Sequence, residues 1–280
     1  MKIKDIYTLY SKHFLVDTDT RNIRKNTIFF ALKGSNFNGN EFAEKALNLG
    51  AIYSIVDDKK HQTNTAIILV DDVLKTLQQL ANYHRKQLNI PIIGLTGSNG
   101  KTTTKELINA VLTEKYRTTA TKGNLNNHIG VPLTLLSMTP KTEIGIVEMG
   151  ANHLKEIEFL CSITEPDFGY ITNFGKAHLE GFGSLEGVIE GKSELYNYLQ
   201  TNNKIAFVNP DDAIQVEKTK KIKTISFDTE DVKFIEANPF VRLSFSDTQI
   251  QSHLIGKYNY TNILAAITIG HYLPWSISMA

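Results

Sequence analysis

The sequence predicts an α/β protein of two domains, in which mostly parallel sheets are covered by helices. Its 280 residues, 41% of them hydrophobic, are enough for about two domains of about 150 residues, each with its own core. From residue 92 onward, strand-like and helix-like segments alternate, which is typical of a parallel sheet with helices on both faces. A glycine-rich segment also joins one expected strand to one expected helix, as in α/β proteins that bind nucleotides.

Composition excludes several classes of protein. The 30 lysines and arginines against 29 acidic residues leave a net charge of +1, too little to attract nucleic acid or an anionic membrane. The single cysteine, Cys161, excludes an internal disulfide framework and suits a reducing cytoplasm. Charged residues interrupt the N-terminus, and no apolar run approaches the roughly 18 residues of a membrane span. We therefore expect a cytoplasmic protein without nucleic-acid partners and without membrane insertion.

Residues 1–84 read as a small α/β domain. Short runs rich in isoleucine, valine and phenylalanine, bounded by polar residues, are typical of buried strands. Asp71 or Asp72 could cap a helix whose apolar residues recur at helical spacing. The expected strands are 27–32, 51–56 and 66–70, and the expected helices are 42–49 and 73–87.

Residues 85–280 read as a second domain, which starts around Pro91. Between residues 222 and 255 the pattern changes to short strands, for which we expect an antiparallel edge. The stretch 272–280 shows no usable period. The expected strands are 92–96, 143–149, 168–172 and 204–208, and the expected helices are 101–115, 154–161, 184–199 and 259–270.

The segment from Gly94 to Thr103 (GLTGSNGKTT) has the strand–loop–helix context of a phosphate-binding loop. Backbone N–H groups of such a loop and the positive helix N-terminus cradle phosphate oxygens. Lys101 would neutralise phosphate charge, and the Thr102 hydroxyl would bind Mg²⁺. The alternative is a glycine turn that only caps a helix. The candidate ATP-binding residues here are Thr96, Gly97, Ser98, Asn99, Gly100, Lys101, Thr102 and Thr103.

Three residues beyond this loop could carry chemistry. Glu148 ends an apolar strand, where α/β sheets bind ligands, and could hold a metal; otherwise it is a surface carboxylate. His178 follows another strand and could be a metal ligand or a base, although a lone histidine is often structural. Lys192, taken alone, reads as a solvated helix lysine paired with Glu190 or Glu194.

The last expected helix opens near two asparagines, with His253 and Gly256 just ahead of them. Asn259 is placed to be its N-cap. Asn262, three residues on, would face the same side, and its amide could read an adenine edge.

Several of these motifs together resemble the Mur ligase family, the ATP-dependent amide-forming enzymes of peptidoglycan synthesis. The N-terminal residues are also similar to the UDP-binding domain of that family, through Asp19–Arg21 and the run 28–34. At 38–42 the chain has Asn-Gly-Asn-Glu-Phe where the family often has Asp-Gly-His-Asp-Phe. The segments that carry the resemblance are 94–105 (GLTGSNGKTTTK), 121–136 (TKGNLNNHIGVPLTLL), 148–157 (EMGANHLKEI), 172–184 (TNFGKAHLEGFGS) and 190–195 (EGKSEL).

The resemblance implies roles that the residues alone do not give. Glu148 and His178 would bind a second Mg²⁺, and Lys192 would be a carbamylated lysine that supports a metal. Asn259 and Asn262 would lie on the adenine side of ATP. The substrate-binding residues would be Thr20, Arg21, Lys33, Gly34, Asn124, Asn126 and Asn127.

The resemblance also implies a reaction. ATP would phosphorylate the carboxylate of UDP-N-acetylmuramoyl-tripeptide, and the amine of D-alanyl-D-alanine would attack the acyl phosphate, in a monomeric enzyme that serves cell-wall biogenesis, cell shape and cell division. The third, Rossmann-like domain usual in the family has no counterpart here, so we expect it to be absent and turnover to be poor. The alternatives are a Mur-type ligase for another amino substrate and a truncated nucleotide-binding remnant.

Overall fold

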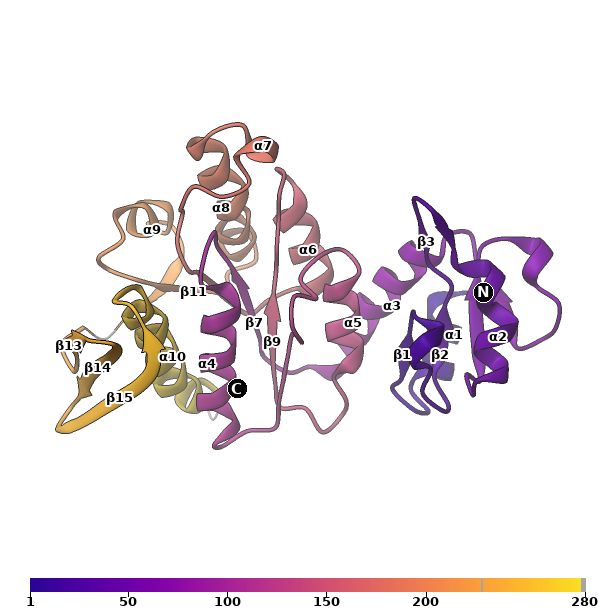
Figure 1. Cartoon of the computed structure of the whole chain (residues 1–280), viewed down its shortest axis with the longest axis horizontal. Helices are drawn as coiled ribbons and strands as arrows, with labels where there is room; N and C mark the ends of the chain where they lie inside the picture. The colour runs from indigo at the N-terminus through magenta and orange to yellow at the C-terminus, as the bar shows by residue number, and fades with distance from the viewer. Residues whose placement is uncertain (228, 278–280) are drawn as a thin grey trace. The chain divides into compact units, whose positions relative to one another are not determined.

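The computed structural model describes residues 1–227 and 229–277, which form two compact units (Figure 1). Two segments from later in the chain belong to the first unit, so the units do not follow a simple division at residue 84. Unit 1 comprises residues 1–89, 128–142 and 162–165, and unit 2 comprises residues 90–127, 143–161 and those from 166 onward.

Unit 1 contains a four-stranded parallel sheet in the order β1-β2-β5-β6. Helix α3 packs against both α1 and α5. The strands are β1 (Val16–Asp17), β2 (Ile28–Phe30), β5 (Tyr53–Val56) and β6 (Ile67–Leu69), with the hairpin strands β3 (Lys33–Gly34) and β4 (Phe37–Asn38). The helices are α1 (Ile3–Tyr10), α2 (Ala43–Asn48), α3 (Val73–Leu88) and α5 (Gly130–Ser137), with the 3-10 turns η1 (Thr20–Asn22), η2 (Gly39–Phe42) and η3 (Lys59–His61).

Unit 2 contains a six-stranded parallel sheet in the order β12-β11-β10-β7-β9-β8, which confirms the predicted α/β class. Its strands are β7 (Ile92–Thr96), β8 (Thr118–Ala120), β9 (Ile144–Glu148), β10 (Phe168–Ile171), β11 (Ile205–Val208) and β12 (Lys223–Ser226). The helices are α4 (Lys101–Thr113), α6 (Glu156–Thr164, whose residues from 162 onward are counted in unit 1), α7 (Leu179–Phe182), α8 (Leu185–Thr201), α9 (Ala213–Lys218) and α10 (Tyr258–Ile277).

The two faces of this sheet bury different side chains. Ile93 and Leu95 of β7 belong to the core that α4 and α10 share, and these two helices lie side by side (Figure 1). On the opposite face, a Cβ at Gly169 would press into Leu195 and Leu199 of α8. A glycine in β10 therefore lets α8 pack closely on the sheet.

The strand order changes direction at β7. The chain passes from β7 to β8 and β9 on one side, and then to β10 on the other side. At such a switch point the loops after two neighbouring strands diverge, and open α/β sheets bind ligands in the crevice between them. The loops after β7 and β10 occupy this place in unit 2.

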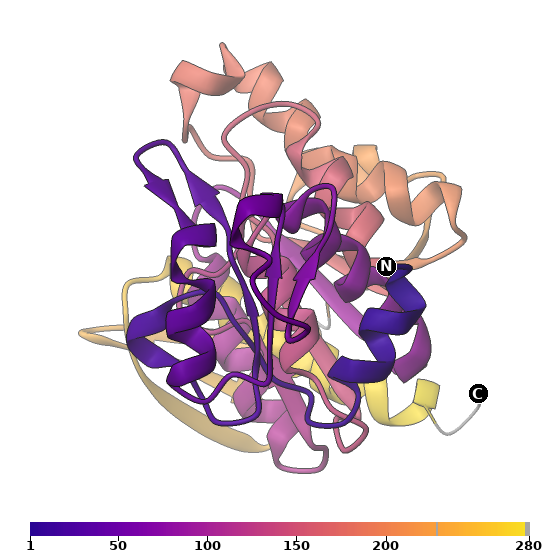
Figure 2. The ribbon, with the colours of Figure 1, turned by 90° about the vertical axis from the view of Figure 1, so that its right-hand side faces the viewer.

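The predicted antiparallel edge at 222–255 is wrong in one respect. Strand β12 is a parallel edge strand of the six-stranded sheet, paired with β11. The antiparallel strands form a separate three-stranded sheet, labelled in Figure 1 and drawn in orange to yellow there and in Figure 2. It consists of β13 (Val232–Ala237), β14 (Phe240–Phe245) and β15 (Thr248–Ile255). Helix α10 also continues past residue 270 to Ile277, through part of the stretch that showed no sequence period.

Within the described ranges, no helix combines the length and the hydropathy that crossing a membrane requires.

A buried histidine lies inside the aromatic cluster of unit 1. The ring of His84 on α3 packs against the rings of Tyr7, Tyr10 and Phe14, and its Nε2 lies 3.0 Å from the Met138 carbonyl oxygen. Its Nδ1 is buried without a hydrogen-bond partner. Burial lowers the pKa of His84 to about 4, although the Met138 carbonyl partly opposes this.

We expect His84 to make unit 1 sensitive to acid. Between pH 6.5 and 4 the unfolded chain binds a proton at this residue and the folded chain does not, so stability falls as the pH falls. The full effect is on the order of 3 kcal/mol. Urea unfolding of the wild type and of His84→Gln at pH 7 and pH 4.5 measures it. The variant should be less stable at pH 7, and the difference should shrink at pH 4.5; an unchanged difference would contradict the assignment.

Candidate functional site

The glycine-rich loop follows β7 and leads directly into α4, as the sequence predicted. Gly97 has φ +140°, and a Cβ there would overlap the Thr172 side chain, so only glycine fits. Gly100, with φ +76°, is the residue before the first turn of α4. Lys101 Nζ donates to the carbonyl oxygens of Gly97 and Ser98, at 2.8 and 3.2 Å. The loop thus has the compact turn and helix N-terminus that a phosphate-binding site requires.

The loop after β10 is bonded to the glycine-rich loop. The Ser98 amide donates to the Asn173 carbonyl at 3.1 Å, and the Ser98 hydroxyl donates to the Gly175 carbonyl at 2.7 Å. Thr172 Oγ1 and Asn173 Nδ2 both donate to the Asn99 carbonyl, at 2.6 and 2.9 Å. These bonds hold the two loops of the switch point together, and sequence reasoning had assigned Thr172 and Asn173 no role.

Glu148 lies at the carboxyl end of β9 and is 1% exposed. Thr102 Oγ1 donates to its carboxylate at 3.1 Å, and Asn126 Nδ2 donates to it at 2.9 Å. The Glu148 amide itself donates to Thr121 Oγ1. The structure therefore brings together one residue from each predicted set: Thr102 for ATP, Glu148 for the metal and Asn126 for the substrate.

Lys101, in the glycine-rich loop, interacts electrostatically with the carboxylate of Glu148. Burial lowers the pKa of Lys101, and the negative charge of Glu148 opposes that shift. A cation beside a buried carboxylate at a helix N-terminus is an arrangement suited to a bound polyphosphate with its own counter-ion.

Lys192 is 1% exposed, so the interpretation as a solvated helix lysine is wrong. Its Nζ donates to the Ala151 carbonyl at 3.0 Å and lies 5.1 Å from the centre of the Phe182 ring. Burial, together with the positive charge of Lys101, lowers the pKa of Lys192 to about 8, against the opposing effect of Glu156 and Glu194. Its amine is therefore partly neutral just above neutral pH.

Glu194 does not pair with Lys192 through a salt bridge. Its carboxylate instead accepts hydrogen bonds from the backbone amides of Lys155 and Glu158, at 2.5 and 2.9 Å. It thereby caps the N-terminus of α6 from a neighbouring helix, which is the favourable end for a negative charge. Lys192 and Glu194 together fix the segment from Ala151 to Glu158.

His178 precedes α7 in a left-handed backbone conformation, with φ +51°. Its Nδ1 is 3.8 Å from the Glu180 carboxylate, and its side chain is 45% exposed. Within residues 1–227 and 229–277, no group of three or more histidine, cysteine, aspartate or glutamate side chains could hold a metal. That His178 and Glu148 bind the same magnesium ion stays a prediction.

Asn259 is not the N-cap that the sequence predicted, because α10 already begins at Tyr258. Its Nδ2 donates to the Ile255 carbonyl, and its Oδ1 accepts from Asn262 Nδ2 at 2.8 Å. Asn262 Oδ1 accepts from Thr104 Oγ1 of α4 at 3.1 Å. The buried amide of Asn262 thus joins α10 to the helix that follows the glycine-rich loop, and its atoms are engaged within the protein.

The predicted substrate residues of unit 1 lie at its surface. Arg21 is held by Asp19, with Nε 2.9 Å from Oδ1, and its side chain is 84% exposed. Lys33, in strand β3 next to Gly34, pairs with Asp57 at 2.7 Å. Asp57 also accepts from Asn40 Nδ2 at 2.9 Å. Thr20 opens the turn η1.

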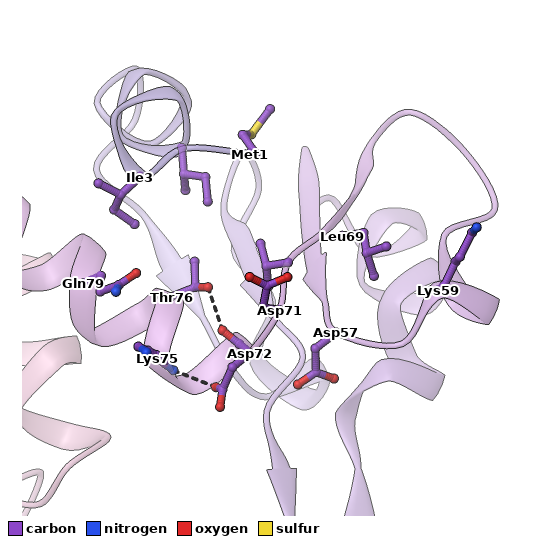
Figure 3. A pocket seen from close by; sticks show the side chains of 12 residues that line it. Met1, Ile3, Asp57, Lys59, Leu69, Asp71, Asp72, Lys75, Thr76 and Gln79 are labelled. Carbon is purple, nitrogen blue, oxygen red and sulfur yellow. Dashed lines mark hydrogen bonds between the residues drawn. The ribbon is translucent and has the colours of Figure 1, made fainter.

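Unit 1 also has a cavity of about 620 Å³ at the carboxyl ends of β5 and β6 (Figure 3). Three carboxylates, from Asp57, Asp71 and Asp72, line it with two lysines and an apolar side formed by residues that include Met1 and Ile3. Asp72 also caps α3 through the Lys75 amide. None of Thr20, Arg21, Lys33 or Gly34 lines the cavity.

Asn124 and Asn127 lie on either side of Asn126 in the segment whose amide reaches Glu148, and both are exposed. Sequence reasoning missed two residues that hold this segment. Lys105 and Thr121 are buried and hold this segment in place. The sequence offered one sign of this, since Lys105 follows Lys101 by four residues and lies on the same side of α4.

Comparison with family models assigns most of the chain. Residues 95–270 match the Mur ligase middle domain, and residues 13–86 match the catalytic domain model of the Mur ligase family.

Curated relatives agree with these models. A Bacillus subtilis protein named UDP-N-acetylmuramoyl-tripeptide--D-alanyl-D-alanine ligase is 38% identical over 92% of this chain and 58% of its own length. The Escherichia coli protein of that name is 34% identical over 91% of this chain and 59% of its own length. The chain thus spans less than two thirds of the relatives it matches.

Solved structures give the same result. MurF from Acinetobacter baumannii superposes with a TM-score of 0.79 at 31% identity, covering 92% of this chain and 59% of that one. MurF ligase from Thermotoga maritima, solved in complex with ADP, gives 0.78 at 31% identity, with coverages of 93% and 63%.

Proposed function

Because this chain belongs to the Mur ligase family, we propose that it binds ATP at the glycine-rich loop and acts in joining D-alanyl-D-alanine to UDP-N-acetylmuramoyl-tripeptide. The observation that carries the proposal is the meeting of Thr102, Asn126 and Glu148 beside Lys101, at the carboxyl end of the central strands. The relatives named for this reaction are the source of the two substrates. We expect the protein to act as a cytoplasmic monomer.

The reaction has two steps. A carboxylate oxygen of the tripeptide attacks the γ-phosphorus of ATP, the bond to the bridging oxygen breaks, and ADP leaves with an acyl phosphate formed. The amine of the dipeptide then attacks the acyl carbon, inorganic phosphate leaves, and the amine gives up a proton. Lys101 and the amides of the glycine-rich loop would bind the phosphates and stabilise the negative charge that builds up in both steps.

The residues around Glu148 fit a magnesium ion. Magnesium prefers oxygen ligands, and a buried carboxylate beside a hydroxyl supplies two of them. The hydrogen bonds that reach this carboxylate come from the neutral groups of Thr102 and Asn126, so a cation would compensate a charge that is costly to bury. When bound, the ion would neutralise phosphate charge. His178 remains a proposed second ligand.

Lys192 fits a carbamate. A neutral amine adds to carbon dioxide, which forms an N–C bond, releases a proton and leaves a carboxylate-like anion. The pKa of about 8 makes the neutral amine available near neutral pH. The resulting anion would support a metal site, as the resemblance implies.

Other proposed contacts rest on the family resemblance. In unit 1, Arg21 and Lys33 are exposed cations that suit a diphosphate, with Thr20 and Gly34 next to them in the sequence. In unit 2, the engaged amide of Asn262 argues for positioning α4 rather than for direct reading of adenine.

The test is to mix the chain with Mg-ATP, UDP-N-acetylmuramoyl-tripeptide and D-alanyl-D-alanine, and to detect the pentapeptide product by mass spectrometry. A second reaction replaces the dipeptide with hydroxylamine, which traps the acyl phosphate as a hydroxamate. Single amino acids in place of the dipeptide test the alternative of another Mur-type ligase.

Product that depends on the dipeptide would support the proposal and show that residues 1–280 suffice. Hydroxamate without pentapeptide would assign the phosphorylation step to this chain and leave the second step unsupported. Nucleotide binding with neither product would favour the nucleotide-binding remnant and overturn the proposed reaction for this chain.

A further inference from the structure

Lys105 is a buried charge that the proposed reaction does not use. It lies on α4, one turn after Lys101, and its side chain is fully buried. Its Nζ donates to the Thr121 carbonyl at 2.6 Å and lies 3.5 Å from the Gly123 carbonyl. It also lies 2.8 Å from the carboxylate of Glu106.

Burying an ammonium group is costly unless its donors are satisfied. The Glu106 side chain is 60% exposed, so water screens much of that ion pair. The partner that is buried with Lys105 is the carbonyl group of Thr121. The hydrogen bonds of Lys105 therefore hold the loop that begins at Thr121.

That loop, residues 121–126, is also held from the other side, by β9. The Thr121 amide donates to the Ile146 carbonyl, and the Glu148 amide donates to Thr121 Oγ1. The Gly150 amide donates to the Asn126 carbonyl at 2.7 Å, and a Cβ at Gly150 would crowd the Asn126 side chain. The loop is thus clamped between the helix that follows the glycine-rich loop and the strand that carries Glu148.

We propose that Lys105 is a positioning residue, which fixes the loop 121–126 so that Asn126 holds the Glu148 carboxylate toward Thr102. The same loop carries Asn124, and Asn127 follows it directly in the chain. Lys105 therefore couples the nucleotide side of the site to the muramoyl-substrate side, and this last part rests on the proposed function.

The variant Lys105→Met tests the clamp, because it keeps an unbranched side chain of similar length and removes the charge and its donors. Lys122, the second residue of the loop, is exposed, so trypsin reports on the loop directly. We expect cleavage after Lys122 to accelerate at least about tenfold, with loss of hydrogen-exchange protection at the Thr121 and Gly150 amides. Glu106→Gln is the matched control, since it alters only the exposed partner.

A second readout separates positioning from general support. Amides of β10, such as that of Tyr170, should keep their exchange protection in Lys105→Met. Equal loss there would show that Lys105 supports the whole unit, and would overturn its assignment to the loop. Lys105→Gln, which retains a donor, provides a milder variant if the methionine variant does not fold.

Calorimetry with UDP-N-acetylmuramoyl-tripeptide tests the coupling without turnover. We expect Lys105→Met to weaken its binding about tenfold or more, and to change ADP binding less than threefold. Unchanged cleavage after Lys122 would overturn the clamp. Faster cleavage with unchanged substrate binding would overturn the coupling. If the wild type itself does not bind the substrate, the proposed function fails, and the cleavage result still decides the clamp.

Discussion

Replacing Lys101 with alanine is expected to reduce ATP-dependent turnover about a thousandfold or more and to leave the fold intact. The ammonium group lies at the N-terminus of α4, with its hydrogen bonds to the loop carbonyls of Gly97 and Ser98 and in the field of Glu148. A developing negative charge on transferred phosphate would lose its nearest fixed cation. The measurement is product formation at saturating ATP, together with the affinity for ADP.

The control for Lys101→Ala is Lys115→Ala, which removes an exposed lysine just beyond the end of the same helix. Thermal unfolding should place Lys115→Ala within a few degrees of the wild type, because an exposed substitution changes stability little. Lys101→Ala removes two hydrogen bonds to loop carbonyls but also the cost of a partly buried charge, so we expect its fold to stay intact. If Lys101→Ala retained turnover at a rate near that of the wild type, this lysine would have no part in the phosphoryl step.

The sequence predicted the glycine-rich loop in its structural setting because local signals determine that setting. The run 92–96 has the length and composition of a buried strand, and the structure has β7 over the same residues. Glycines and Lys101 then mark the turn and the helix start, as found. Secondary structure that depends on spacing along the chain is accessible from sequence alone.

Partners far apart in the chain were not accessible in this way. Asn262 bonds to Thr104 across 158 residues, and nothing local to either residue indicates the other. The prediction of Asn259 as a cap failed because its side chain pairs with Asn262 rather than with free amides of the helix start. Tertiary packing, which a single sequence does not display, decides such cases.

The burial of individual side chains was the other property that could not be predicted from the sequence. Lys192 and Lys105 are both among charged neighbours in the sequence, so both look like solvated helix lysines, yet each is buried and donates to a backbone carbonyl. The small antiparallel sheet gives a related case. Its strands were expected because the sequence changes to short strand-like segments there, but whether they extend the main sheet or form their own depends on which edges meet.

Lys192→Ala is expected to lower turnover about a hundredfold or more, and added acetate or propionate is expected to restore part of it. The buried amine has a pKa of about 8, so at pH 8 close to half of it is neutral and able to add carbon dioxide. If the resulting anion supports a metal, a diffusible carboxylate can enter the space that alanine leaves. If the lysine acts only by its bond to Ala151, carboxylates will not help.

A readout independent of turnover makes this test for Lys192 decisive. Uptake of ¹³C-labelled carbon dioxide, followed by NMR, should increase from pH 7 to pH 9, because the neutral amine becomes more abundant as the pH rises through 8. The signal should be absent in Lys192→Ala and unchanged in Glu190→Gln, an exposed neighbour on α8. It should also weaken at pH 8 in Lys101→Ala, since removing that charge raises the pKa of Lys192. A wild type without any labelled carbamate, or a variant that carboxylates do not restore, would leave Lys192 as a structural residue that fixes the segment after β9.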